Sequence, residues 1–442
     1  MVATYVGVQN GHSVCYLNSV MQQLFMIPSI REHILQLPSQ QVESSDNVVP
    51  KQFFLSELKS LFMSLENGRS SHGIRSSGSN EAIDPLPLCK AIWNPLNLSD
   101  GTEKMQGAYL DVEKQMDASE FFSLLLAQLS SSLGSTNPLL QVGRFICGNL
   151  CNELFIAGDD SAPVIGRNRV LNSEQFYFIS VKVGSFGAAA AAATSASAST
   201  NPPRAQSMSI KSLRKALDDF SSDQNLKSFW PSSGGGRELL PSKSSSTLSA
   251  SSLPPHFIIH LKRFRFDFAK MRQVKVNSRF EYPLSLDLWG YTAEARRERA
   301  EDAAWEKSMR EGTADEMDMD TTSALPDSSA LKKRCKYVLG GVIVHTGTAR
   351  DGHYFSLVKE RKEDQRSGKD TAGITTHDVT SNAPAEQAER VEEVTRRDRW
   401  LKMNDEEVTE FSLEDLQSET FGGHTHGPLK KQSAFILIYD RV

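Results

Sequence analysis

Hydrophobic residues recur at helical spacing through the first third of the chain. In the residues that follow Cys15 the apolar positions recur with a period of about 3.6 residues, and a second run of this kind lies at 53–63. A third run opens at Asp117, where the order Asp-x-x-Glu, completed by Glu120, is typical of a helix N-terminus. Residues 1–140 are therefore predicted to be mostly helical.

Runs rich in β-branched and aromatic residues dominate the rest of the chain. Strands are predicted near 176–181, 256–268 and 274–288, in a hairpin between 337 and 358, and in a closing strand at 434–439. A short amphipathic helix is expected between the first two of these, at 210–220.

Four segments lack either period and are expected to be insertions. They lie near 186–209, 231–254, 291–334 and 361–398. The first two are rich in Ala, Ser, Gly and Pro, the third is charged and contains an exposed helix from Glu294, and the fourth is polar. Such compositions are typical of mobile surface loops, which we favour over a partner-binding role.

Composition narrows the class of protein. With 442 residues the chain exceeds the usual size of one hydrophobic core, so sub-domains or long insertions are expected. The net charge is −5 without a basic stripe, which argues against nucleic acid as a partner. No apolar run approaches the about 20 residues that cross a bilayer, and no secretory signal precedes the first helix, so no membrane association is expected. Five cysteines without a paired framework favour a reducing compartment, the cytoplasm or the nucleus.

Cys15 stands where a loop runs into a helix. Unpaired backbone N–H groups at a helix start favour negative charge, so the pKa of its thiol is expected to fall and the thiolate to act as a nucleophile. Asn10, five residues upstream, can present a side-chain N–H group where an oxyanion would form. The alternative is a buried structural cysteine, which is the commoner fate of a lone cysteine.

Two later stretches supply the partners that a nucleophilic cysteine needs. His353 lies where the loop of the predicted hairpin meets its second strand, which suits a general base. His345 competes with it, although a histidine hydrogen-bonded within the sheet is the better interpretation of that residue. Asn404 and Asp405 lie at a predicted strand end, where an amide or a carboxylate can orient the imidazole.

These residues carry a resemblance to the catalytic domain of the ubiquitin-specific proteases. The cysteine motif of that family is matched at five positions: Gly7, Asn10, Cys15, Tyr16 and Asn18. Four further motifs follow in the family's order, at 115–122, 257–264, 352–354 and 400–408. The resemblance covers essentially the whole chain and is nearest to the large fat-facets-like branch.

The resemblance implies an α+β fold of the papain-like, hand-shaped class in a single domain over 1–442. The helical thumb would span 1–140, the fingers 141–255 and the palm 256–442. It also implies a deubiquitinating thiol hydrolase, with ubiquitin and ubiquitinated proteins as partners. Cys15 would attack the C-terminal glycine of ubiquitin and His353 would transfer the proton. Asn404, with Asp405 as support or substitute, would orient the imidazole, and Asn10 would stabilise the oxyanion.

The family's Gln-Asp motif lies along the channel for the ubiquitin tail, which carries two arginines before its terminal Gly-Gly. Carried over, Gln115 belongs to this motif, while Asp117 and Glu120 would supply carboxylates to the tail and Tyr354 would narrow the passage. Asp117 and Glu120 also suit a helix N-terminus, and one residue can serve both purposes.

The chain departs from the family at two positions of the cysteine motif, where His12 replaces a Gly and Val14 replaces a Thr. If His12 is strained or Val14 leaves a donor unpaired, His12→Gly with Val14→Thr should raise kcat about tenfold. The alternative function is accordingly a catalytically impaired ubiquitin-binding scaffold of the same fold.

No metal and no cofactor are expected. The family commonly holds a structural zinc with two Cys-x-x-Cys pairs, and this chain has none: three residues separate Cys147 from Cys151. His424 and His426 lie close together in the sequence but have no cysteine near them.

Overall fold

A computed structural model gives the fold. It describes residues 5–37, 50–69, 82–92, 110–132, 139–156, 169–186, 208–229, 240–268, 270–311, 328–361, 398–424 and 429–442. Parts of all four expected insertions lie outside the described residues. These parts are most of the insertions near 186–209 and 361–398, residues up to 239 of the insertion near 231–254, and residues 312–327 of the insertion near 291–334.

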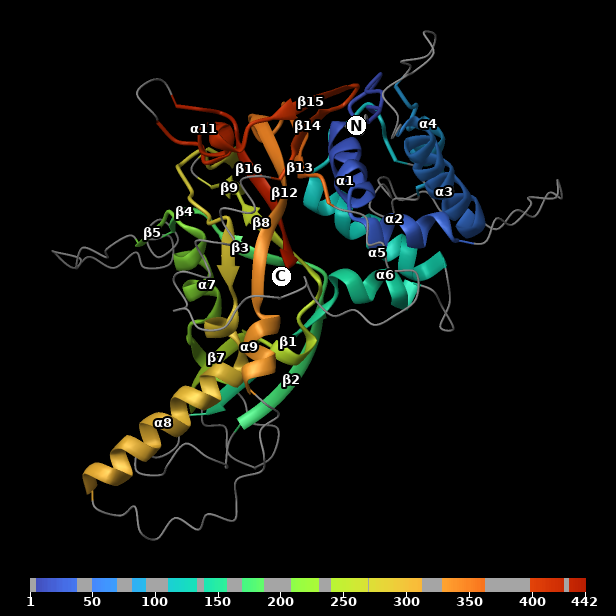
Figure 1. The fold of residues 1–442 in the computed structure, drawn as a ribbon. Coiled ribbons are helices and arrows are strands. Elements are labelled where there is room, and N and C mark those ends of the chain that lie inside the picture. Colours follow the sequence, from blue (N-terminus) through green and yellow to red (C-terminus); the bar gives the residue numbers. More distant parts are fainter. Residues whose placement is uncertain are drawn as a thin grey trace, which may run out of the picture.

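The N-terminal part of the chain is helical, as predicted. Its helices are α1 (Cys15–Phe25), α2 (Pro28–Leu35), α3 (Pro50–Gly68), α4 (Leu86–Ala91), α5 (Ala118–Ser132) and α6 (Leu139–Ile146). They gather on one side of the molecule (Figure 1). Every residue of α1 is buried, because this helix packs between α2, α5 and strand β13. Asp117 caps α5 by accepting a hydrogen bond from the Ser119 backbone N–H at 2.7 Å.

An eight-stranded sheet packs beside α1. Its strands are β3 (Ile179–Lys182), β8 (His256–Lys262), β11 (Ser285–Asp287), β12 (Lys336–Gly347), β13 (Gly352–Lys359), β14 (Trp400–Asn404), β15 (Glu407–Phe411) and β16 (Ser433–Arg441). The order is β15-β14-β13-β12-β16-β8-β3, and β11 pairs with β12. Only the β3–β8 pair is parallel among the strands described. The predicted hairpin is β12–β13, and the predicted closing strand is β16 at the centre of the sheet.

Both faces of the central strands are buried. One face packs on α1 and the other helices, while the opposite face packs on a second core around α7 (Leu213–Ser221) and α11 (Leu416–Thr420). This double burial explains why β12 reads as an almost continuous apolar run rather than as an alternating one.

A second sheet lies at the far end of the molecule from β14 and β15 (Figure 1). It contains β1 (Gly148–Ile156), β2 (Arg169–Phe176), β6 (Gln224–Phe229) and β7 (Leu240–Leu248), in the order β2-β1-β7-β6. Strand β7 corrects the prediction of an insertion across 231–254. Its serine-rich residues hydrogen-bond to strands on both sides, and Ser245 and Thr247 are buried although neither is apolar.

The remaining elements are short or peripheral. They are the pairs β4 (Gly184–Phe186) with β5 (Met208–Ile210) and β9 (Phe264–Asp267) with β10 (Arg272–Lys275), and the helices α8 (Ala293–Glu311) and α9 (Ser328–Arg334). Helix α8 projects away from the body (Figure 1) and is the exposed helix expected within 291–334. Among the residues described, no helix is both long and apolar enough to cross a bilayer.

Candidate active site

Cys15 is the first residue of α1 and only 3% exposed. The loop before it is held in place by two hydrogen bonds, from the Val14 N–H to Asn10 Oδ1 at 3.1 Å and from the Ser13 N–H to the Val112 carbonyl at 2.8 Å. The sulfur itself accepts from the backbone N–H of Tyr354 at 3.5 Å. The predicted position of the cysteine at a helix start is confirmed.

The expected fall in the pKa of Cys15 is wrong for this structure. Burial raises the pKa of the thiol to about 11, the Tyr354 N–H opposes this, and the carboxylate of Asp405 adds to it. The N–H groups at the start of α1 do not compensate for the loss of water around a buried thiolate. Cys15 is consequently a thiol at neutral pH and needs a base to become a nucleophile.

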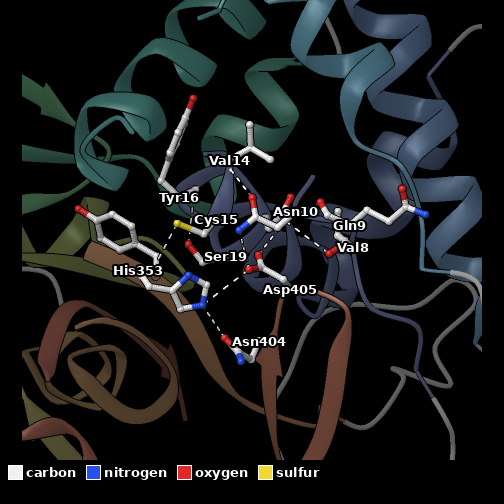
Figure 2. A network of polar contacts seen from close by, with 12 residues as sticks. Val8, Gln9, Asn10, Val14, Cys15, Tyr16, Ser19, His353, Asn404 and Asp405 are labelled. Carbon is white, nitrogen blue, oxygen red and sulfur yellow. Dashed lines mark hydrogen bonds and ion pairs between the residues drawn. The ribbon is translucent and has the colours of Figure 1, made fainter. Parts of the chain in front are cut away.

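His353, the second residue of β13, is the candidate for that base. Its Nε2 atom lies 2.6 Å from Asn404 Oδ1 at the end of β14 and 3.6 Å from Asp405 Oδ2. Its other ring nitrogen, Nδ1, lies on the side of Cys15 (Figure 2). Three segments that are distant in the sequence therefore bring together the nucleophile, the base and the orienting group that the motifs predicted.

Asp405 connects these segments. It occupies the turn between β14 and β15 with φ of +50°, a left-handed conformation that Asp tolerates better than most residues. Its carboxylate accepts from Asn10 Nδ2 at 2.9 Å and Asn18 Nδ2 at 2.8 Å. Its carbonyl accepts from the Val8 N–H at 2.9 Å and Gln22 Nε2 at 3.2 Å. Asp405 thus binds the cysteine loop and helix α1 as well as His353.

The approach of the N-terminal loop to this turn requires a glycine. A Cβ atom at Gly7 would lie 2.2 Å from the Glu406 carbonyl oxygen. Asn18 was not predicted as a site residue, although its place in the cysteine motif was a signal. It is fully buried and its amide reaches the carbonyl of Gln9 as well as Asp405.

Asn10 has a wider role than the one predicted. Its amide oxygen accepts from Val14, and one N–H of its amide donates to Asp405 (Figure 2). The side chain therefore joins the cysteine loop to the β14–β15 turn, and at most one further N–H remains for an oxyanion.

His345 is not placed to act as the base. Its ring is 1% exposed and lies against Tyr354, with 4.6 Å between the ring centroids, and against Phe264. Burial lowers its pKa to about 2, so the ring is neutral. Its Nδ1 atom has no hydrogen-bond partner among the described residues, so the expected hydrogen bond within the sheet is wrong on that side of the ring. The ring also explains why position 352 is a glycine, because a Cβ atom at Gly352 would lie 2.1 Å from His345 Nε2.

A pocket of about 560 Å³ brings together the four residues predicted to contact a ubiquitin tail. Gln115, Asp117, Glu120 and Tyr354 all line it, together with residues of β8–β10 and the β12–β13 hairpin. Burial and the neighbouring Asp117 carboxylate raise the pKa of Glu120. Asp117 serves as both the cap of α5 and a wall of the pocket, as the sequence allowed.

Neither departure from the family motif disturbs the cysteine loop. The only described non-glycine residues with positive φ are Met271 and Asp405, so His12 is unstrained. Its Nδ1 atom lies 2.8 Å from Glu113 Oε1. The backbone N–H of Val14 is paired with Asn10. The conditions under which a tenfold gain was expected from reverting both residues are therefore not met.

The structure gives no positive sign of a metal site. Within the described part of the chain, no three His, Cys, Asp or Glu side chains converge as metal ligands would. No two of the five cysteines are joined in a disulfide. His426 lies outside the described residues, and the absence of zinc stays a prediction.

Comparison with known proteins finds a matching family and several curated relatives. The family described as ubiquitin carboxyl-terminal hydrolase matches residues 6–439. Over 99% of its length the chain is 24% identical to Ubiquitin carboxyl-terminal hydrolase 9Y of Mus musculus, 24% identical to hydrolase 34 of Homo sapiens and 25% identical to hydrolase puf of Drosophila melanogaster. It spans 16%, 10% and 9% of those proteins, respectively. A family match over nearly the whole chain, on a fold that joins a cysteine at a helix start to a histidine on a sheet, leads to one conclusion: the chain belongs to the ubiquitin carboxyl-terminal hydrolase family, a group of papain-like α+β cysteine peptidases.

Proposed function

We propose that this chain is a deubiquitinating thiol hydrolase that cleaves the bond after the C-terminal glycine of ubiquitin. The observation that carries the proposal is the contact of His353 with Asn404 at 2.6 Å, which directs the free ring nitrogen toward the side of Cys15. Ubiquitin and ubiquitinated proteins would be its partners. Five cysteines that form no disulfide with one another support a reducing compartment, the cytoplasm or the nucleus.

The reaction would begin with transfer of the Cys15 proton to His353. The sulfur attacks the carbonyl carbon of the terminal glycine, and the π electrons of the carbonyl move to its oxygen. The oxyanion then collapses, expelling the amine, which takes the proton from the imidazolium. Water, deprotonated by His353, hydrolyses the thioester, so that free ubiquitin and the Cys15 thiol are regenerated.

The pocket supports ubiquitin as the substrate. Asp117 and Glu120 place two acidic side chains in its wall, beside which the arginines of the ubiquitin tail would be favoured. The lining is of mixed charge, because it also contains Lys114, Lys262, Arg265 and Arg350. Tyr354, which lines the pocket, would narrow the passage for the terminal Gly-Gly.

A catalytically impaired scaffold is the second candidate, and the raised pKa of Cys15 favours it. Hydrolysis of a fluorogenic amide at the C-terminus of ubiquitin separates the two. The hydrolase predicts turnover that Cys15→Ala abolishes and that Cys89→Ala, a matched change at a buried cysteine with pKa raised to about 12, preserves. Binding of ubiquitin without any turnover would instead establish the scaffold.

A further inference from the structure

Gln115 lies beside the nucleophile and not only along the pocket. Its Nε2 atom is 3.8 Å from Cys15 Sγ, and its Oε1 atom accepts from the backbone N–H of Gly352 at 3.0 Å. Because the amide oxygen is occupied by Gly352, the N–H₂ end of the side chain is the end that faces the sulfur. Gln115 therefore touches the nucleophile and the strand that carries His353.

The loop that carries Gln115 is fastened to the cysteine loop on its other side. The Ser13 N–H donates to the Val112 carbonyl at 2.8 Å, and His12 Nδ1 lies 2.8 Å from Glu113 Oε1. The Gln115 amide is thus positioned between β13 and the cysteine loop before any substrate binds. Electrostatic stabilisation of a transition state requires donors that are positioned in advance in this way.

We propose that Gln115 is a catalytic residue that donates an N–H to the oxyanion formed at Cys15, beside or in place of Asn10. The inference rests on the proposed thiol hydrolase function. When the Cys15 sulfur bonds to a carbonyl carbon, the π pair moves to an oxygen that is separated from the sulfur by that single carbon. A donor 3.8 Å from Sγ can then come within the about 2.7–3.1 Å at which an oxyanion donor acts.

The hydrogen bonds of Asn10 give the second reason. One of its N–H bonds donates to Asp405 and its oxygen accepts from Val14, so Asn10 offers at most one donor to the oxyanion. Oxyanion holes commonly combine two donors, and no other side-chain amide among the described residues contacts Cys15 Sγ. Gln115 completes the pair.

Two substitutions separate this role from tail binding and from a purely structural role. Gln115→Glu keeps an oxygen for the Gly352 N–H but removes the N–H₂ group that faces Cys15, whereas Gln115→Ala removes both. We expect both variants to lower kcat on a fluorogenic ubiquitin amide by about 10²–10³, with KM nearly unchanged. Gln36→Glu, the same change at an exposed residue at the end of α2, is the control.

A binding measurement gives a readout that a structural role would not move. Ubiquitin aldehyde forms a tetrahedral adduct with the cysteine, whereas unmodified ubiquitin does not. Gln115→Glu should weaken the complex with the aldehyde by about 10²-fold while leaving the affinity for unmodified ubiquitin close to that of the parent.

The outcomes distinguish the inference from the function on which it rests. A parent without turnover would overturn the proposed function itself. If the parent shows turnover and Gln115→Glu keeps the parent kcat, with or without a change in KM, the catalytic role of Gln115 is wrong. Gln115 would then be a tail-binding residue only.

Discussion

Asn404 determines which nitrogen of His353 can act as the base. Its Oδ1 atom lies 2.6 Å from His353 Nε2, and an amide oxygen can only accept, so Nε2 carries the proton. Nδ1 is then left with its lone pair on the side of Cys15. Asn404 thus fixes the tautomer of His353, as the orienting residue of a cysteine peptidase does. Substitutions of Asn404 and Asp405 can measure how much each contributes.

Asp405→Ala should be more damaging than Asn404→Ala. Among the described side chains, the imidazole of His353 is the only one that Asn404 contacts. Loss of the Asn404 side chain should therefore lower kcat by about tenfold. Asp405→Ala also removes the carboxylate that accepts from the half-buried Asn10 amide and the buried Asn18 amide. We expect it to lower kcat by about 10² or more and the free energy of unfolding by about 2 kcal/mol. Steady-state kinetics and urea denaturation measure both effects.

Glu406→Ala is the matched control for this comparison, because Glu406 is an exposed residue of the same turn. It should leave kcat and stability at the parent values. A larger loss from Asn404→Ala than from Asp405→Ala would contradict the central place given to the carboxylate.

His353→Ala should lower kcat by about 10² or more while leaving ubiquitin binding nearly intact, as expected for the loss of a general base. His345→Ala should act mainly on stability. The buried ring packs on Tyr354 and Phe264, so its removal should cost about 2–4 kcal/mol of unfolding free energy. Kinetics on the folded fraction of each variant measure the difference. Equal losses of kcat in two well-folded variants would mean that the choice of His353 as base is wrong.

Reverting the two motif departures should bring no gain. His12→Gly with Val14→Thr relieves no strain, because His12 has no positive φ and the Val14 N–H is already paired. It also removes the contact between His12 and Glu113. We expect kcat to stay level or fall slightly in steady-state assays. A tenfold rise, equivalent to about 1.4 kcal/mol, would show that the parent loop is poorly organised for catalysis.

The raised pKa of Cys15 predicts a particular pH dependence of alkylation. The thiolate is the reactive form, and burial favours the neutral thiol, so below a pKa of about 11 the thiolate fraction should increase tenfold for each pH unit. The rate of Cys15 carboxamidomethylation in the free protein should therefore continue to rise from pH 7 to pH 10. Mass spectrometry of the peptide that contains Cys15 measures this rate. A plateau beginning near pH 7 would indicate a preformed thiolate and contradict this assignment.

The sequence was sufficient to predict the structural setting of the candidate site residues. A helix start at Cys15, a hairpin that presents His353 and a strand end at Asn404 are local features, and local periodicity and turn residues report them directly. The helical first third of the chain and the cap at Asp117 were predictable for the same reason.

Features that depend on distant contacts were not predictable. The pKa of Cys15 follows from burial of its thiol, which the backbone N–H of Tyr354, 339 positions away in the chain, only partly offsets. The links from Asp405 to Asn10 and Asn18 exist only because the β14–β15 turn packs on the cysteine loop. Strand β7 was missed because its composition is polar, and pairing with β1 and β6 outweighs its low hydrophobicity.

Labelling with a ubiquitin derivative that carries an electrophile at its C-terminus tests the proposed hydrolase in one step, since one adduct requires both recognition of ubiquitin and a competent nucleophile. We expect a single adduct of one ubiquitin, located by peptide mass spectrometry at Cys15 and at none of Cys89, Cys147, Cys151 or Cys335. We also expect Cys15→Ala to abolish labelling. An adduct that persists in Cys15→Ala, or a folded parent that binds ubiquitin and is never labelled, would contradict the proposed function.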